Sequence, residues 1–438
     1  MTPAARLQAV IDLLDAQAKS PRPVDVDTAT YFRGRRYIGA KDRRAISERL
    51  YGILRRRARL GWWLERAHSP HTDGRAMVMA DLAITDRMVP DMVAELFSGW
   101  DTHGPRPLSA EDVTLLQALN GKPLFHDEMP AWVRGEYPEW TETVWQSLFG
   151  ERAAAEIGVM RDEAPVDLRV NTLKADRKTA LRSLREAGVA ARETRYSPLG
   201  LRLEKRTALT ALEAFRQGWV EVQDEGSQLV AFLCEVEPGM QVVDFCAGAG
   251  GKTLALAAFL GNKGRLFACD TVKERLDRSA ERLRRAGVDT VVRQHLSGEN
   301  DKWVKRNARR FDRVLVDAPC SGTGTWRRNP DAKWRLTPQD VAELSGLQAR
   351  ILKSASGLVK PGGAIVYATC SLLPEENEHV VEGFLAGNPD FCPVPLSEVW
   401  KRTPGGEAPC PDPWLRLSPA THGTDGFFAA VLKRVEQA

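Results

Sequence analysis

Short apolar strands and helices alternate along the chain from residue 237 onwards, and this pattern constrains the fold more than any other feature. Strands are expected at 240–246, 264–270, 289–295, 311–320, 362–371 and 426–434. Helices are expected between them at 252–261, 272–287, 337–359 and 376–388. Such an order predicts an α/β domain with a largely parallel sheet and helices on both faces. Ligands of these sheets bind beyond the carboxyl ends of the strands, where the strand order reverses.

The first 236 residues do not show this alternation of strands and helices. Residues 1–125 carry apolar side chains at helical spacing and predict an all-α domain. Residues 126–236 begin with a Pro- and Trp-rich joint and then predict a strand and a helix, which makes a small α/β segment. We therefore expect three domains: 1–125, 126–236 and 237–438.

Composition narrows the class of protein. No run approaches the roughly 18 apolar residues that would span a bilayer, and the N-terminus has no secretory signal. The chain has seven cysteines without a C-x-x-C pair and seven scattered histidines, so neither a disulfide framework nor a metal site is expected. We expect a cytoplasmic monomer that needs no metal and no membrane.

Residues 31–60 are rich in arginine, hold only two acids and carry interleaved aromatic side chains. One interpretation is a solvated helix face. The other is a surface that contacts nucleic-acid phosphates. The run alone does not decide between them.

The stretch "DFCAGAGGKT" (244–253) ends like a phosphate-binding loop. That loop requires a glycine five residues before Gly251, where this chain has Cys246. A dinucleotide loop requires a third glycine where this chain has Thr253. An acid that ends one strand, a short glycine loop and a second strand-end acid, Asp270, instead suit S-adenosylmethionine, which has no pyrophosphate.

Two cysteines follow buried strands: Cys320 in "DAPCSGTG" and Cys370 in "YATCSLLPEENE". A lone cysteine in such a place is most often a small core residue. A pair at the ligand edge favours chemistry on a pyrimidine ring. Carbon 5 of the ring becomes nucleophilic after a thiolate adds to carbon 6, and thiolate is also a good leaving group. Asp317 can hydrogen-bond the edge of the same ring.

These motifs resemble the Nop/Sun family of RNA cytosine-5 methyltransferases, most closely its bacterial RsmB branch. "DFCAGAGGKT", "DAPCSGTGTWRRNPDAKW", "YATCSLLPEENE", "DGFF", "LRVNTLK" and "VQDEGSQL" all match signatures of that family. The resemblance implies a Rossmann-like methyltransferase core, and it makes the N-terminal region similar to a NusB-like RNA-binding domain.

The resemblance also implies residue roles. Cys370 is the expected nucleophile, Cys320 assists product release, Asp317 orients the cytosine, and Lys252 lies near the cofactor's carboxylate or the base. Arg327 and Arg328 are expected to meet the RNA backbone. The expected S-adenosylmethionine-binding residues are Asp244, Cys246, Ala247, Gly248, Gly250, Lys252, Asp270, Arg275 and Asp317.

Two positions depart from the family pattern. Ala249 stands where the family usually has proline, which should be tolerated. Leu296 stands where an aspartate usually reads the adenine amino group. Either Glu299 or Asn300 replaces that aspartate, or packing alone holds adenine.

The predicted activity is thus S-adenosylmethionine-dependent methylation of cytosine carbon 5 in RNA, with ribosomal RNA of the 16S type as the expected substrate. Transfer RNA is the nearest alternative substrate. A third hypothesis is a non-catalytic RNA-binding or assembly protein that has kept the fold.

Overall fold

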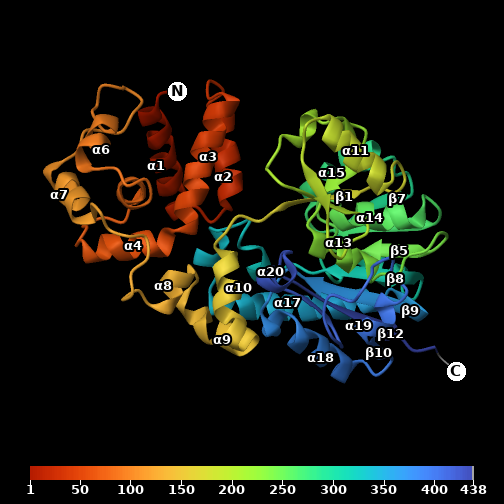
Figure 1. The fold of residues 1–438 in the computed structure, drawn as a ribbon. Helices are drawn as coiled ribbons and strands as arrows, with labels where there is room; N and C mark the ends of the chain where they lie inside the picture. Colours follow the sequence, from red (N-terminus) through yellow and green to blue (C-terminus); the bar gives the residue numbers. More distant parts are fainter. Residues whose placement is uncertain (437–438) are drawn as a thin grey trace. The chain divides into compact units, whose positions relative to one another are not determined.

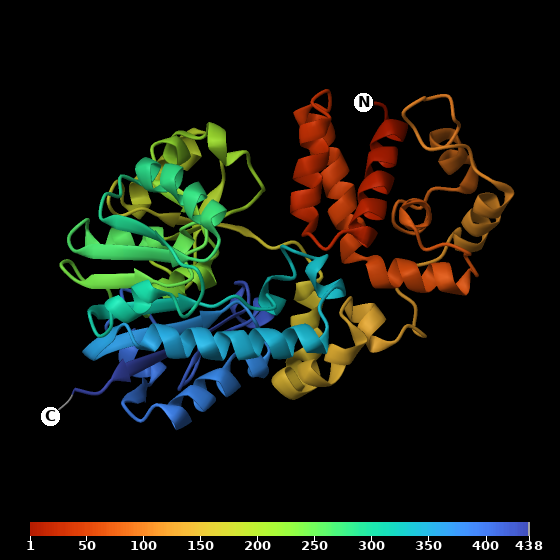
Figure 2. The same ribbon diagram turned by 180° about the vertical axis from the view of Figure 1, so that it is seen from behind.

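The computed structural model describes residues 1–436 and divides into two compact units. One unit comprises Met1–Asp162 together with Trp326–Leu336, and the other comprises, within the described residues, 163–325 and 337–436. Figures 1 and 2 trace both units along the chain from opposite sides. A segment from the C-terminal half of the sequence thus belongs to the N-terminal unit.

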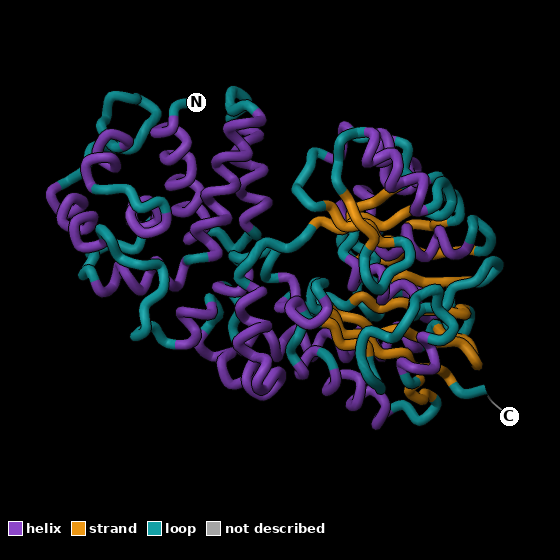
Figure 3. Tube along the Cα trace, in the orientation of Figure 1, coloured by secondary structure: helices purple, strands orange, loops and turns teal. Residues whose placement is uncertain are grey.

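The N-terminal unit is built from helices, as Figure 3 shows. Its apolar residues at helical spacing are buried, including Leu7, Leu14, Ile46 and Leu50, so the expected helical N-terminal region is confirmed. A π-helix over Asp81–Thr85 continues α5. The helices are α1 Pro3–Lys19, α2 Val24–Gly34, α3 Ala40–Arg55, α4 Arg57–Arg66, α5 Gly74–Ala80, α6 Pro90–Leu96, α7 Ala110–Leu119, α8 Ala131–Gly135, α9 Glu142–Phe149 and α10 Ala153–Met160.

The segment Trp326–Leu336 is anchored in this unit at both ends. The ring of Trp326 meets Trp145 edge to face at 5.6 Å, and Trp140 Nε1 donates a hydrogen bond to the carbonyl oxygen of Leu336 at 3.2 Å. Between them, Asp331 accepts a hydrogen bond from the backbone of Val24 at 3.1 Å. A 3-10 turn, Ala332–Trp334, lies in the middle of the segment.

The second unit begins with a small antiparallel sheet of order β2-β3-β1-β4. Leu168, Val170 and Leu201 of the sheet are buried together with Ala180 and Leu184 of α11. The elements are β1 Val166–Val170, α11 Arg177–Glu186, β2 Ala191–Glu193, β3 Gly200–Leu203, α12 Glu213–Arg216 and β4 Val220–Val222.

The main sheet has the order β10-β12-β9-β8-β5-β6-β7, with β11 beside β12. Strands β5 to β9 are parallel, and β10, β11 and β12 pair antiparallel, so the expected largely parallel sheet is confirmed. The strands are β5 Gln241–Asp244, β6 Arg265–Asp270, β7 Val291–His295, β8 Phe311–Asp317, β9 Val359–Thr369, β10 Phe391–Val394, β11 Leu415–Leu417 and β12 Phe427–Arg434.

Helices cover both faces of this sheet because successive strand residues point to opposite sides. Val242 faces a cluster that includes α13, α14 and α19, and Val243 faces a cluster with α16, α17 and α18. The helices are α13 Glu225–Phe232, α14 Gly251–Leu260, α15 Lys273–Ala286, α16 Lys302–Arg306, α17 Pro338–Ser356, α18 Glu378–Gly387, α19 Leu396–Trp400 and α20 Pro419–His422.

The strand order reverses between β5 and β8. From β5 the chain proceeds to β6 and β7 on one side, and β8 and β9 then follow on the other side. A ligand site is expected at the carboxyl ends of these two strands, where Asp244 and Asp317 lie.

None of the helices within residues 1–436 is long and apolar enough to cross a membrane. In the same residues there is no group of three or more His, Cys, Asp or Glu side chains that could hold a metal ion.

Candidate active site

The glycine loop turns the chain from β5 into α14. Gly248 and Gly250 have φ angles of +54° and +83°, which residues with a Cβ rarely adopt. A Cβ on Gly250 would also lie 3.0 Å from Cβ of Ser279. The hydroxyl of Thr253 donates a hydrogen bond to Asp244 Oδ2 at 2.7 Å. The Gly-Lys-Thr tail therefore braces the end of the strand.

Asp270 closes the other side of the loop. Its carboxylate accepts hydrogen bonds from the backbone N–H of Gly248 at 2.8 Å and of Val272 at 2.7 Å. A carboxylate has about four acceptor positions, so two remain for hydroxyl donors. These are the acceptors that a ribose diol needs.

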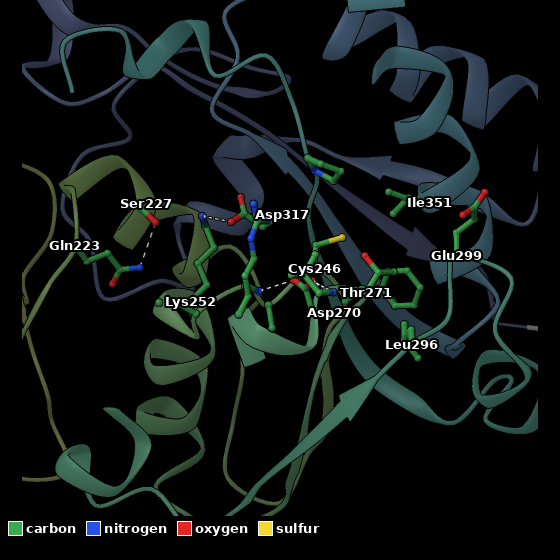
Figure 4. Close-up of a pocket in the computed structure, with 18 of the residues that line it drawn as sticks. Gln223, Ser227, Cys246, Lys252, Asp270, Thr271, Leu296, Glu299, Asp317 and Ile351 are labelled. Atoms are coloured by element: carbon green, nitrogen blue, oxygen red, sulfur yellow. Dashed lines mark hydrogen bonds and ion pairs between the residues drawn. The ribbon is translucent and has the colours of Figure 1, made fainter. Parts of the chain in front are cut away.

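A pocket of about 760 Å³ opens beside this loop (Figure 4). Its size is within the range of about 300–1,000 Å³ that is typical of small-molecule sites. Of the residues expected to bind the cofactor, those that line it are Cys246, Ala247, Gly248, Lys252, Asp270, Arg275 and Asp317.

Asp244 and Gly250 are not among the lining residues. Asp244 is fully buried behind the loop, and burial raises its pKa to about 7. Cys246 does line the pocket. Burial raises the pKa of its thiol well above the ordinary 9.0, so it is a neutral wall group.

The far end of the pocket carries three apolar side chains and one carboxylate. Leu296, only 1% exposed, lines it together with Leu347 and Ile351 of α17. Glu299 also lines this end, and Asn300 does not. Figure 4 shows Leu296, Ile351 and Glu299 grouped together, away from Lys252.

Sequence reasoning missed several lining residues. Gln223, Asp224 and Ser227 line the pocket from the end of β4 and the start of α13. Arg282 of α15 lines it as well, and its guanidinium donates a hydrogen bond to the carbonyl oxygen of Ala249 at 2.6 Å. The motif "VQDEGSQL" contains the first three residues and was the available signal.

Lys252 and Asp317 form an ion pair at the inner end of the pocket. Lys252 Nζ lies 2.7 Å from Asp317 Oδ2, and the two side chains point toward each other in Figure 4. Lys252 is buried, whereas the side chain of Asp317 is 32% exposed. Burial alone would lower the pKa of Lys252, but the charge and hydrogen bond of Asp317 raise it. Lys252 is thus held as a cation, and Asp317, which lines the pocket, keeps acceptor capacity toward it.

Cys320 and Cys370 come together although 50 residues separate them in the sequence. Their sulfur atoms lie 3.4 Å apart. The hydrogen bond to Cys370 and burial raise the pKa of Cys320 well above the ordinary 9.0. Cys320 is therefore the protonated partner, with its S–H available to the sulfur of Cys370. Neither cysteine lines the pocket, but Asp317 and Pro319 of the Cys320 loop do.

Glu376 binds the loop that carries Cys320. Its fully buried carboxylate accepts hydrogen bonds from the backbone N–H of Ser321 at 2.8 Å and from Gln348 Nε2 at 2.9 Å. It also accepts a short hydrogen bond from the hydroxyl of Ser321. Gln348 in turn donates to the carbonyl oxygen of Pro319 at 2.9 Å. The residues on both sides of Cys320 are thereby fixed.

The same network reaches the Cys370 loop. The hydroxyl of Ser371 lies 3.2 Å from the hydroxyls of Ser321 and Thr323. Asn377 Nδ2 donates to the carbonyl oxygen of Ser371 at 3.0 Å. The serine that follows each cysteine and the Glu-Asn pair after the second one thus tie the two loops together. The sequence motifs contained these residues, but no role was predicted for them.

A close backbone contact explains two glycines of the motifs. Gly426 N donates to the carbonyl oxygen of Gly324 at 2.8 Å. A Cβ on Gly324 would lie 2.3 Å from the carbonyl oxygen of Gly426. The "SGTG" loop therefore packs against the start of β12 only because both positions lack a side chain.

The basic run 31–60 contains two distinct sets of cations. Arg49, Arg56 and Arg59 form ion pairs with acids of their own unit, at 2.6 to 2.8 Å. These arginines support the helical fold. Another set is exposed, and no ion pair to it is found within the described residues 1–436: Arg33, Arg36, Lys41, Arg44 and Arg57.

Arg327 and Arg328 belong to the inserted segment of the helical unit. Arg327 is only 4% exposed, and its carbonyl oxygen accepts a hydrogen bond from Arg55 Nη2 at 3.1 Å. Arg328 is partly exposed. Of the two, Arg328 is the one with a surface that RNA could reach.

Comparison with known proteins gives consistent matches. A model described as 16S rRNA methyltransferase RsmB/F matches residues 231–433, and a model of the ferredoxin-like domain of RsmF/B-like methyltransferases matches residues 137–210. A Klebsiella pneumoniae protein named ribosomal RNA small subunit methyltransferase B is 30% identical over 416 residues, which cover 91% of each chain.

Solved structures agree. The crystal structure of PH0851 is 25% identical, has a TM-score of 0.80 and covers 99% of both chains. A methyltransferase homolog from Pyrococcus horikoshii is 31% identical with a TM-score of 0.60, and the match covers 69% of this chain and 97% of that one. These findings confirm the resemblance drawn from the motifs and the Rossmann-like methyltransferase core.

Proposed function

Since this chain belongs to the 16S rRNA methyltransferase RsmB/F family and is therefore a methyltransferase, we propose that it methylates carbon 5 of a cytosine in small-subunit ribosomal RNA. The methyl donor is S-adenosylmethionine. The observation that carries this proposal is the pair of sulfur atoms 3.4 Å apart, in loops that lead to the Lys252–Asp317 ion pair.

The residues that line the pocket suit S-adenosylmethionine, the methyl donor. Asp270 offers acceptors to a ribose diol, and Leu296, Leu347 and Ile351 offer an apolar slot to a purine ring. Arg275 and Lys252 are the cations available to a carboxylate. When bound, S-adenosylmethionine supplies an electrophilic methyl group. Leu296 stands where an adenine-binding aspartate was expected. We propose that packing against the purine ring, with Glu299 at the rim, takes the place of that aspartate.

The reaction begins at Cys370. The S–H of Cys320 can hydrogen-bond its sulfur and stabilise a thiolate there. The thiolate forms a bond to carbon 6 of the cytosine, and the electron pair of the ring moves to carbon 5. Asp317, held in place by its ion pair with Lys252, accepts a hydrogen bond from the 4-amino group or from a protonated N3. Carbon 5 then takes the methyl group.

Product release reverses the addition. The proton on carbon 5 is lost, the bond between carbon 6 and the sulfur breaks, and Cys370 leaves as a thiolate. Cys320 assists this step because its S–H lies where the departing sulfur regains its charge. One proton is released to solvent for each methyl group transferred. The cytosine must leave any stacked helix to reach the two sulfurs.

RNA binding is the proposed role of the helical unit, with the exposed cations of residues 31–60 and Arg328 as phosphate contacts. We further propose a three-domain division at residues 125 and 236. A cytoplasmic location is proposed from the proposed ribosomal RNA substrate. A monomer is proposed because the pocket and both cysteines come from a single chain.

Bisulfite sequencing of small-subunit ribosomal RNA from cells with and without the gene tests the function. We expect one or more cytosines to be protected only when the gene is present. Purified protein should transfer a labelled methyl group to RNA from the deletion cells, and Cys370→Ala should abolish transfer. Unchanged protection in the deletion cells, together with no transfer in vitro, would refute the proposal.

A further inference from the structure

Lys333 is a buried lysine that contacts an aromatic ring but no anion in the described residues 1–436. It is contributed by the inserted segment of the helical unit and is only 2% exposed. In the part of the chain that the structure describes, no hydrogen bond or ion pair to its ammonium group is found. Its Nζ lies 5.4 Å from the centre of the Trp334 ring. A buried charge is costly unless an anion compensates it.

Two neighbouring groups also have unused donors. Trp334 Nε1 is buried, and no hydrogen-bond acceptor for it is found among residues 1–436. The guanidinium of Arg57 lies over the same ring at 5.9 Å, and no ion pair to it is found in the described chain. Arg57 is exposed, whereas Lys333 and Trp334 Nε1 are buried. Donors gather here without an acceptor.

The nearby acid, Glu136, is already engaged. Its carboxylate accepts hydrogen bonds from the backbone N–H groups of Ala58 and Arg59, at 2.9 and 3.1 Å, and from Arg59 Nε at 2.8 Å. It thereby caps the start of α4 and neutralises one arginine.

The electrostatic surroundings of Lys333 agree with an excess of positive charge. Burial, opposed by the charge of Glu136 and assisted by the guanidinium groups of Arg59, Arg55 and Arg161, lowers its pKa to about 8. The cluster as a whole therefore lacks an anion.

We propose that Lys333, Trp334 and Arg57 bind a phosphate group of the RNA backbone. A phosphate carries acceptors only, so it matches an ammonium, an indole N–H and a guanidinium. Arg57 continues the basic run of α3 and α4, which gives a backbone a path to the site. The inference rests on the proposed RNA substrate, and it assigns to the inserted segment a direct part in holding that substrate.

The test compares the full-length protein with Lys333→Met and with Lys178→Met, which removes the same charge from an exposed position on α11. Binding of a fluorescent, random-sequence single-stranded RNA is measured by anisotropy over a range of salt concentrations. Lys333→Met should bind roughly tenfold more weakly at low salt. The slope of log K against log salt should be smaller in magnitude by about 0.7. Trp334→Phe, which keeps the ring and loses the N–H, should weaken binding less.

Thermal unfolding of the same variants separates binding from structure. Because an unpaired buried charge is removed, Lys333→Met should melt at the same or a higher temperature than the wild type. A lower melting temperature would overturn the proposal, since the charge would then be needed for folding. Equal RNA affinity and equal salt slope in Lys333→Met and Lys178→Met would also overturn it.

A free anion is distinguished by adding inorganic phosphate. If phosphate raises the melting temperature of the wild type but not of Lys333→Met, and RNA binding is equal in both, the site holds a free anion and the RNA assignment is wrong. The proposed function is judged separately by methyl transfer from wild-type protein. If wild-type protein transfers no methyl group, the RNA-binding comparison of Lys333→Met with Lys178→Met can still be interpreted.

Discussion

Replacing Glu376 by leucine should disorder the loop that carries Cys320. The substitution removes the acceptor of three hydrogen bonds, from the N–H and hydroxyl of Ser321 and from Gln348 Nε2. The hydroxyl can turn to Ser371, but the N–H and the amide lose their buried acceptor. At about 1–3 kcal/mol for each unsatisfied buried donor, Glu376→Leu should destabilise this unit by about 2–6 kcal/mol.

Glu376→Gln is the matched control. The glutamine oxygen can keep the bonds from Ser321 N and Gln348, and the amide can donate to the hydroxyl of Ser321. Stability should then stay within about 1–2 kcal/mol of the wild type. The negative charge of Glu376 is one cause of the raised pKa of Cys320. Its removal should therefore lower that pKa and increase the thiolate fraction.

Two measurements detect the loss of loop order and the change in the pKa of Cys320. Hydrogen exchange of a peptide around Ser321 should speed up strongly in Glu376→Leu and little in Glu376→Gln. Alkylation of Cys320, followed by peptide mass spectrometry, should be faster in Glu376→Gln than in the wild type at mildly alkaline pH. If leucine and glutamine gave the same exchange rate, the hydrogen-bond argument would fail. An unchanged alkylation rate would refute the electrostatic part.

Further predictions concern other charges and thiols. The pKa of Lys333 is lowered from 10.5 to about 8, so the folded form loses this proton first, and stability should rise by up to about 3 kcal/mol between these pH values. The groups that face it are Glu136, Arg55, Arg59 and Arg161. Lys333→Met should flatten that rise in unfolding experiments. A peroxide should convert the thiols of Cys320 and Cys370 to a disulfide with reduction of the peroxide to water, because the sulfurs need to close only from 3.4 Å to about 2.05 Å. Activity should be lost and then restored by a dithiol; failure to find the linked peptides by mass spectrometry would count against the geometry. Asp270→Asn should weaken S-adenosylmethionine binding by roughly 10–100-fold in calorimetry, because charged hydrogen bonds to the ribose are lost. If Asp270→Asn bound S-adenosylmethionine as tightly as the wild type, Asp270 would only support the loop.

Much of the second unit, which carries the pocket and the two cysteines, could be predicted from local patterns. Strand and helix periodicity predicted the parallel sheet, and the topology rule predicted a ligand site beyond the carboxyl ends of its strands. The structure identifies β5 and β8 as the strands between which the order reverses. Asp270 and Asp317 end strands and Lys252 lies in the first turn of a helix, so their place at the pocket was foreseeable. The short strands β10 and β11 were not predicted, because they have no clear alternation of their own.

The remaining features depend on contacts between distant parts of the chain. No local pattern indicates that Glu376 accepts hydrogen bonds from Ser321, 55 residues away. Lys333 lies in a segment that the sequence order assigns to the catalytic domain, yet it packs in the helical unit. Asp244 looks like a ligand-binding acid in the sequence, but the hydrogen bond from Thr253 turns it into a buried support of the loop.

The most direct test of the central claim is to trap the covalent adduct between cytosine and Cys370. Cys320→Ala should accumulate an RNA–protein complex that survives denaturation, with the cytosine attached at Cys370 in peptide mass spectrometry. Cys370→Ala should form no such complex. An adduct that forms in Cys370→Ala and is attached at Cys320 would contradict the account and reverse the roles of the two cysteines.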